Sequence, residues 1–173
     1  MSILKFENRT PRNLQQMYEY LTDRKKTDFY GIFGIGLNPF KAVTDMQLMQ
    51  NLYRRQPLAH EYFQVILSFD EGIMLNISRA RVICERIGEV LITDKRQVFG
   101  AIHYLNKDAY KMHCHYLINY VGTDGSLYRQ NHSVYYYRDL VNEILQEYGL
   151  NPIQKLQCSD SNYYEGTENY EEI

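Results

Sequence analysis

Residues 112–121 read Met-His-Cys-His-Tyr-Leu-Ile-Asn-Tyr-Val. The aromatic and β-branched residues of this stretch favour a β-strand over a helix. Because side chains alternate across a strand, His113 and His115 point from one face toward the same spot, whereas Cys114 points to the opposite face as a small core residue. Two imidazoles that converge in this way are the beginning of a divalent-metal site. Hydrogen-bonded structural histidines are the alternative interpretation.

A third histidine lies on the preceding predicted strand, residues 97–105, which we expect to pair with 112–121. A register that places His103 opposite His113 or His115 gathers three imidazoles on one face, and a shift of one residue sends His103 to the other face. Three neutral histidines leave positions on a cation for water or phosphate oxygens, which suits Lewis-acid catalysis. Asn119 continues the histidine face and is a candidate to orient a ligand or phosphate, or to cap a turn.

The rest of the chain alternates strand and helix patterns. Residues 1–7 and 60–70 are predicted strands, and Gly31, Gly34 and Gly36 mark an irregular loop. Amphipathic spacing predicts four helices, the first with Thr10 as its cap and Pro11 at its first position: 11–21, 41–55, 76–91 and 133–148. This order predicts an α+β fold with a central antiparallel β-sheet, helices on one face and the other face free for a site.

Length and composition predict one globular domain. The chain has 173 residues, of which 45% are hydrophobic. No apolar stretch reaches the roughly 20 residues that span a bilayer, and the N-terminus is too short and charged for a secretory signal. Three cysteines at unrelated spacings predict a cytoplasmic protein. We place the domain at residues 1–155, with an acidic, flexible tail at 156–173.

The distribution of charge along the chain bears on whether the protein binds a nucleic acid. The formal net charge of −2 argues mildly against such a partner. However, residues 159–173 contain five acidic and no basic residues, so positions 1–158 hold 19 basic against 16 acidic residues. The folded part of the chain is therefore expected to be slightly basic.

Tyr20 is the candidate nucleophile. On the first predicted helix, Tyr18 belongs to the apolar stripe, and Tyr20 lies about 200° around the helix, free to reach a ligand. A phenol is a weak nucleophile near neutral pH and needs a metal-polarised phosphate or a nearby base. An ordinary surface tyrosine is the alternative.

A family resemblance joins these features. Residues 20–27, Tyr-Leu-Thr-Asp-Arg-Lys-Lys-Thr, are similar to the Tyr-hydrophobic-Thr/Ser-x-x-x-Lys motif of relaxases, the MobA-like mobilisation nucleases of the HUH endonuclease superfamily. The later order also resembles theirs: a Gly/Asn loop at 36–38, Ser-Phe-Asp-Glu at 68–71, then His103 and His-x-His-x-x-x-Asn at 113–119. The resemblance spans roughly residues 14–150.

The resemblance implies the HUH endonuclease fold and a DNA relaxase, a metal-dependent nicking-joining endonuclease of plasmid or mobile-element conjugation. Tyr20 would attack single-stranded DNA at an origin of transfer and keep a 5′-phosphotyrosine. His103, His113 and His115 would hold Mg²⁺ or Mn²⁺. The DNA contacts would come from Arg24, Lys25, Lys26, Asn119 and Arg129. Accessory mobilisation proteins are further expected partners.

Departures from the family keep alternatives open. Two residues after the first histidine the family commonly has Asp, where this chain has Leu105, and Asp108 in a longer loop is the candidate replacement. One alternative is a tyrosine transposase or rolling-circle initiator of the same fold that uses Tyr135 or Tyr136. Another is a DNA-binding accessory module without catalysis.

Overall fold

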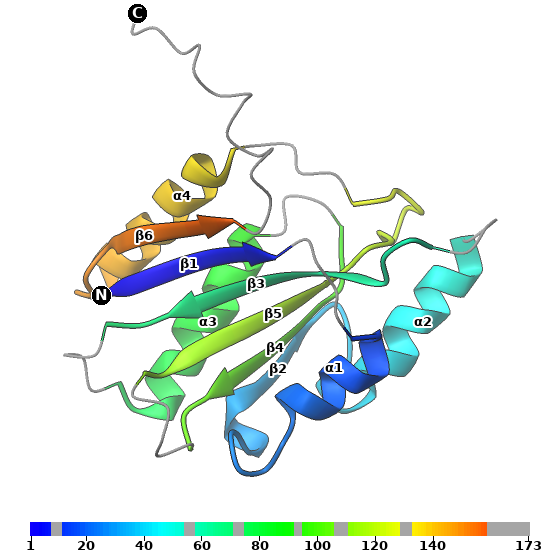
Figure 1. Ribbon diagram of the computed structural model, residues 1–173, viewed down its shortest axis with the longest axis horizontal. Coiled ribbons are helices and arrows are strands. Elements are labelled where there is room, and N and C mark those ends of the chain that lie inside the picture. The colour runs from blue at the N-terminus through cyan, green and yellow to red at the C-terminus, as the bar shows by residue number, and fades with distance from the viewer. Residues whose placement is uncertain are drawn as a thin grey trace, which may run out of the picture.

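A six-stranded sheet runs through the molecule in the order β2-β4-β5-β3-β1-β6 (Figure 1). The computed structural model describes residues 1–7, 12–53, 58–70, 75–91, 95–105, 111–128 and 133–158. The strands are β1 (Ser2–Glu7), β2 (Ile32–Ile35), β3 (Tyr62–Ser68), β4 (Val98–His103), β5 (His113–Asn119) and β6 (Ile153–Cys158). The helices are α1 (Leu14–Leu21), α2 (Ala42–Tyr53), α3 (Ile77–Leu91) and α4 (Val134–Glu147), with short 3₁₀ turns η1 (Phe29–Gly31) and η2 (Pro39–Lys41).

The sheet is antiparallel except at one edge, where β1 and β6 run parallel. The β4 and β5 strands lie inside the sheet and are almost entirely buried, because helices cover one of their faces and part of the other. The predicted α+β class with a central antiparallel sheet is therefore confirmed.

The helices are divided between the two faces of the sheet. The helices α3 and α4 pack against the face that carries Cys114 and Tyr116, behind the sheet in Figure 1. The α1 and α2 helices pack against part of the opposite face, over Phe99 and Leu117. The prediction of helices on one face is thus incomplete, since the histidine face is half covered and the site lies beside α1.

Three element boundaries differ from those predicted. The α1 helix begins with Asn13 as its cap, through a capping box with Gln16, and Thr10 and Pro11 lie outside the described residues. The predicted glycine loop contains the short strand β2. The β6 strand runs to Cys158, so the sheet crosses the predicted boundary at 155/156, and residues 159–173 lie outside the described ones.

Within the described residues, no helix is long and apolar enough to cross a membrane.

Candidate active site

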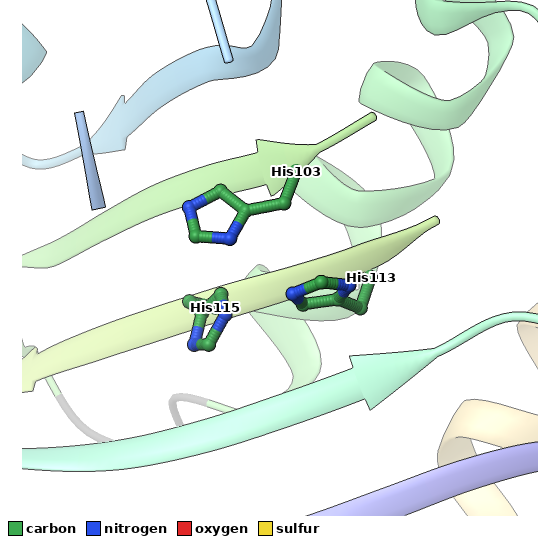
Figure 2. Close-up of side chains that lie close together, drawn as sticks. All are labelled: His103, His113 and His115. Atoms are coloured by element: carbon green, nitrogen blue, oxygen red, sulfur yellow. The ribbon is translucent and has the colours of Figure 1, made fainter. Parts of the chain in front are cut away.

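Three imidazoles meet on one face of β4 and β5 (Figure 2). The register pairs His103 with His113 and Ala101 with His115, which is one of the two arrangements that gather the rings. Ring centroids lie 5.0 Å apart for His103 and His113, 4.6 Å for His103 and His115, and 5.0 Å for His113 and His115. One nitrogen from each ring lies within 4.8 Å of the other two, so the cluster could hold a metal ion.

A hydrogen bond orients each ring. The Nε2–H group of His103 donates to the Leu21 carbonyl at 3.0 Å, and the Nδ1–H group of His113 donates to the Lys111 carbonyl at 3.0 Å, since a carbonyl oxygen only accepts. The Nδ1 atom of His115 lies 2.9 Å from the side-chain amide of Gln64. These bonds leave Nδ1 of His103 and Nε2 of His113 and His115 to face a cation.

The residues present fit a divalent cation. The Nε2 atom of His115 is buried and has no hydrogen-bond partner, which is costly unless another group satisfies it. Burial lowers the pKa of His103 to about 4. Burial also holds the pKa of His115 well below its usual value, and the nearby His103 lowers it further. Both rings are therefore neutral near pH 7, with lone pairs available to a metal.

Gln64 sets the tautomer of His115. As drawn, the amide nitrogen donates to Nδ1, which places the ring proton on Nε2. A half-turn of the amide presents Oε1 to an Nδ1–H group instead and frees Nε2 to bind a cation, and the two orientations place the amide oxygen and nitrogen at interchanged but equivalent positions. Gln64 is buried on β3 on the histidine face, so it is placed to hold either arrangement.

Tyr20 stands next to the histidine cluster. Its side chain is 39% exposed, and its ring centroid lies 6.2 Å from that of His103 in an edge-to-face arrangement. The neighbouring Leu21 carbonyl accepts from His103, so the end of α1 is joined to the cluster. Tyr18 turns away, as predicted: its ring packs on Phe99 and its hydroxyl donates to the Pro39 carbonyl at 3.0 Å.

Two cations lie over the Tyr20 ring. The Lys26 Nζ atom is 3.2 Å from the ring centroid and donates to the Tyr20 carbonyl, while the guanidinium carbon of Arg12 is 4.4 Å from the centroid. The Lys26 carbonyl accepts from the backbone N–H groups of Tyr104 and Leu105, both at 3.0 Å. The loop after α1 is thus fixed to the end of β4, and it holds positive charge beside the phenol.

The other predicted DNA contacts have different placements. The Arg24 and Lys25 side chains are exposed on the same loop. Asn119 is fully buried, and its amide bonds to Gln50, Gln97 and the Met46 carbonyl, so its predicted contact with DNA is wrong. Arg129 and Asp108 lie outside the described residues.

Tyr135 and Tyr136, the candidate nucleophiles of a transposase or rolling-circle initiator, lie on the side of the sheet opposite the histidines. Tyr135 and Tyr136 are exposed at the start of α4, whose Tyr137 packs on Phe6 in the core cluster opposite the histidines. The sheet therefore separates α4 from the imidazole nitrogens, and of the three candidate nucleophiles Tyr20, Tyr135 and Tyr136, it is Tyr20 that lies beside them.

Sequence reasoning missed Arg12 and Gln64. Gln64 could have been noticed as a polar residue within the otherwise apolar run 62–67, because a polar side chain inside a buried strand needs a hydrogen-bond partner. Arg12 precedes the helix and carries no comparable signal, because its approach to Tyr20 depends on how the chain enters α1.

The chain is similar to known proteins over most of its length. The family model described as "Relaxase: MobA/VirD2-like, nuclease domain" matches residues 20–150, a range that includes Tyr20 and all three histidines. No curated protein sequence matches the chain. A solved structure described as "Molecular Basis of Vancomycin Resistance Transfer in Staphylococcus aureus" is similar in fold, with a TM-score of 0.53 and 12% sequence identity. The match covers 93% of this chain and 98% of the other.

Proposed function

The chain belongs to the relaxase family, through its MobA/VirD2-like nuclease domain, and from that premise we propose that it nicks single-stranded DNA at an origin of transfer by tyrosine transesterification. The observation that carries the proposal is the position of Tyr20, whose ring centroid lies 6.2 Å from that of His103. A phenol and a group of metal-ligating nitrogens this close together can act on one phosphodiester.

His103, His113 and His115 would hold the cation, Mg²⁺ or Mn²⁺. When bound, such a cation supplies Lewis-acid polarisation of a phosphoryl oxygen. The chain contributes neutral rings in fixed orientations: the Leu21 and Lys111 carbonyls and the Gln64 amide prevent the rings from turning away.

The bonds exchanged are those of a phosphodiester. The Tyr20 Oη atom forms a bond to the scissile phosphorus, and the bond from phosphorus to the 3′ oxygen breaks. The phenolic proton passes to solvent, and the released 3′ oxygen takes up a proton to become a 3′-hydroxyl. Tyr20 keeps the 5′ phosphoryl group, and the reverse exchange rejoins the strand.

Lys26 and Arg12 support this exchange electrostatically. Both cations already lie within 4.4 Å of the Tyr20 ring centroid, so positive charge is in place where negative charge builds up on the phenol and phosphate oxygens. The exposed Arg24 and Lys25 extend the positive charge along the loop, where backbone phosphates would approach.

A labelled-DNA experiment tests the proposal. The protein is incubated with Mn²⁺ and a pool of single-stranded oligonucleotides labelled at the 3′ end, because the fragment that stays on the tyrosine carries that end. We expect wild-type protein, and the Tyr135→Phe and Tyr136→Phe variants, to acquire the label covalently. The Tyr20→Phe variant should acquire none.

Two results would contradict the proposal. Loss of the adduct in Tyr135→Phe or Tyr136→Phe, but not in Tyr20→Phe, would favour the transposase or rolling-circle alternative. Binding of the oligonucleotides without any adduct in the presence of Mn²⁺ would favour an accessory DNA-binding module.

A further inference from the structure

Three large aromatic side chains next to the loop between α1 and η1, residues 22–28, are exposed to solvent. On the proposed function we call this segment the catalytic loop. Phe29 is 61% exposed, Tyr30 60% and Phe40 54%. The rings of Phe29 and Phe40 are nearly parallel, with centroids 5.7 Å apart and an interplanar angle of 8°. Tyr30 meets Phe29 edge to face, with centroids 5.5 Å apart. Contiguous exposed aromatic surface of this kind marks a binding site more often than a chance arrangement.

The two turns that carry these rings are held in place before any ligand arrives. The Asp28 side chain caps η1 by accepting from the Tyr30 backbone at 2.9 Å, and it also accepts from the Tyr104 hydroxyl. The Asn38 side chain caps η2 by accepting from the Phe40 backbone at 3.0 Å. Because the backbone is fixed, a flat ligand would meet a preformed surface and little conformational entropy would be lost on binding.

A cleft of about 450 Å³ opens beside the rings. Its lining residues are Thr22, Arg24, Thr27, Asp28, Phe29, Ile32 and Phe40. Thr22 caps the C-terminus of α1, two residues after Tyr20, so the cleft begins where the nucleophile's helix ends. The volume is within the range of small-ligand sites and is enough for a planar heterocycle with part of its backbone.

The charge around the cleft favours a polyanion. Arg24 forms part of its wall, Lys25 is exposed next to Arg24, and Lys41 is exposed next to Phe40. Asp28 is the acidic residue of the wall, and its Oδ1 atom accepts from the Tyr30 backbone and from the Tyr104 hydroxyl. Aromatic faces bordered by cations are the combination with which proteins bind single-stranded nucleic acid.

We propose that this cleft holds one unpaired base of the DNA strand, stacked on the Phe29–Phe40 pair, while Arg24 and its neighbours contact the adjoining phosphates. The proposal rests on the proposed function for the identity of the strand, and it adds a subsite that holds the DNA through a base. An unpaired strand fits better than a protein segment, because the cations bordering the rings match a phosphate backbone and the cleft adjoins the nucleophile's loop.

The test separates base contacts from phosphate contacts without knowledge of the nicked sequence. Binding is measured by fluorescence anisotropy with two probes, a 12-nucleotide oligothymidine and a 12-unit abasic deoxyribose-phosphate strand, in Tyr20→Phe protein so that no cleavage occurs. The second protein carries Phe29→Ala and Phe40→Ala in addition. Base stacking of this kind is worth about 1–3 kcal/mol per base, so we expect its oligothymidine affinity to fall about 5- to 150-fold. Affinity for the abasic strand should change less than about twofold.

Control variants keep the result interpretable. Phe40→Tyr retains an aromatic face and should keep wild-type affinity. Tyr135→Ala removes an exposed ring from α4, on the other side of the sheet, and should also leave affinity unchanged. Thermal unfolding of each variant confirms folding, and because Phe29 and Phe40 are more than half exposed we expect little loss of stability.

The proposal is overturned if the double substitution leaves oligothymidine binding unchanged, if it weakens both probes equally, or if the parent Tyr20→Phe protein does not prefer oligothymidine to the abasic strand. The nicking proposal is judged separately by the covalent adduct. An adduct with unchanged oligothymidine binding would reject only the base subsite, and a base-dependent loss without an adduct would reject only the chemistry.

Discussion

Lys26 combines two interactions that are separable by mutation. Its ammonium group lies over the Tyr20 ring, and its carbonyl fixes the loop to β4. Lys26→Gln removes the charge and the ammonium donor but leaves the backbone contact in place, so we expect the single-turnover rate of adduct formation to fall about 100-fold, as when one electrostatic contact to a transition state is lost. Lys26→Arg should restore much of the rate.

Lys25→Gln is the matched control for Lys26. Lys25 is the adjacent residue and is exposed, and its side chain has no contact with the Tyr20 ring among the described residues. We expect this variant to weaken DNA binding modestly and to leave the rate with saturating DNA unchanged. Equal rate losses in both variants would mean that positive charge anywhere on the loop, and not the contact of Lys26 with the Tyr20 ring, sets the rate.

Gln64 should tune metal affinity without contacting the metal. Its amide is the partner of His115 Nδ1, so Gln64→Leu leaves that nitrogen without a partner in a buried place. Loss of such a supporting contact usually costs about 10- to 100-fold in metal affinity. Titration with Mn²⁺ by calorimetry measures the effect, and Gln64→Glu, which retains an acceptor, should lose less. An unchanged affinity in Gln64→Leu would remove Gln64 from the site.

The histidine cluster predicts acid sensitivity of the metal-free protein. The pKa of His103 is about 4 in the folded protein, against about 6.5 when unfolded, so protons bind the unfolded chain more readily. The corresponding stability is present above pH 6.5 and is lost as the pH falls toward 4. We expect a loss of about 2 kcal/mol, which is less than the full shift implies because one side of the site is near solvent.

Urea unfolding at pH 7 and pH 4.5, in the presence of a chelator, measures this loss. His103→Gln cannot titrate, so its free energy of unfolding should fall less between the two pH values than that of the wild-type protein. Identical pH dependence in both proteins would show that His103 does not contribute.

At the scale of elements, the local sequence pattern was sufficient to predict the longer strands and helices. The predicted strand pair 97–105 and 112–121 is confirmed as β4 and β5, and alternation alone placed Cys114 opposite the histidines. The four-residue β2 was missed, because Gly34 within it and glycines on either side resemble a loop. The β6 strand was missed because, among its described side chains at 153–157, only Ile153 is buried, so the strand shows no alternating buried face.

Gly31 and Gly149 exclude side chains for different reasons: Gly31 because of close packing near the site, and Gly149 because of its backbone conformation away from the site. A Cβ atom at Gly31 would lie 2.2 Å from Thr27 Oγ1 and 2.8 Å from the Ile102 carbonyl, so η1 and the catalytic loop would have to shift. At Gly149 a Cβ atom would meet nothing within 4 Å, but the φ angle of 70° disfavours any side chain.

We therefore expect Gly31→Ala and Gly149→Ala to differ in function more than in stability. Gly31→Ala should cost about 1–3 kcal/mol in unfolding free energy and also slow adduct formation, because Tyr20 and Lys26 move with the loop. Gly149→Ala should cost about 1 kcal/mol and leave the rate unchanged. Thermal unfolding and single-turnover kinetics on both variants check this, and a normal rate in a destabilised Gly31→Ala protein would contradict it.

At the scale of the whole molecule, the site depends on contacts between segments far apart in the sequence. The Leu21 carbonyl meets His103, 82 residues later, and Gln64 meets His115, 51 residues later. The order of motifs indicated which residues matter, but periodicity within one element holds no information about how α1 docks on the sheet. For that reason the histidine triad and Tyr20 could be predicted, whereas the burial of Asn119 and the role of Arg12 could not.

The charge that attracts DNA is local, since the formal net charge of the whole chain is −2. Each phosphate neutralised on a single strand contributes about 0.7 to the slope of log affinity against log salt concentration. Arg24→Gln and Lys25→Gln should therefore each lower the magnitude of that slope by about 0.7, and the pair together by about 1.4. Lys155→Gln removes the same charge from β6, at the other end of the sheet order from the β2–β4 edge, and should leave the slope unchanged. Anisotropy titrations of oligothymidine between 50 and about 200 mM salt give the slopes. Equal effects from all three positions would mean that overall charge, and not the loop after α1, attracts the strand.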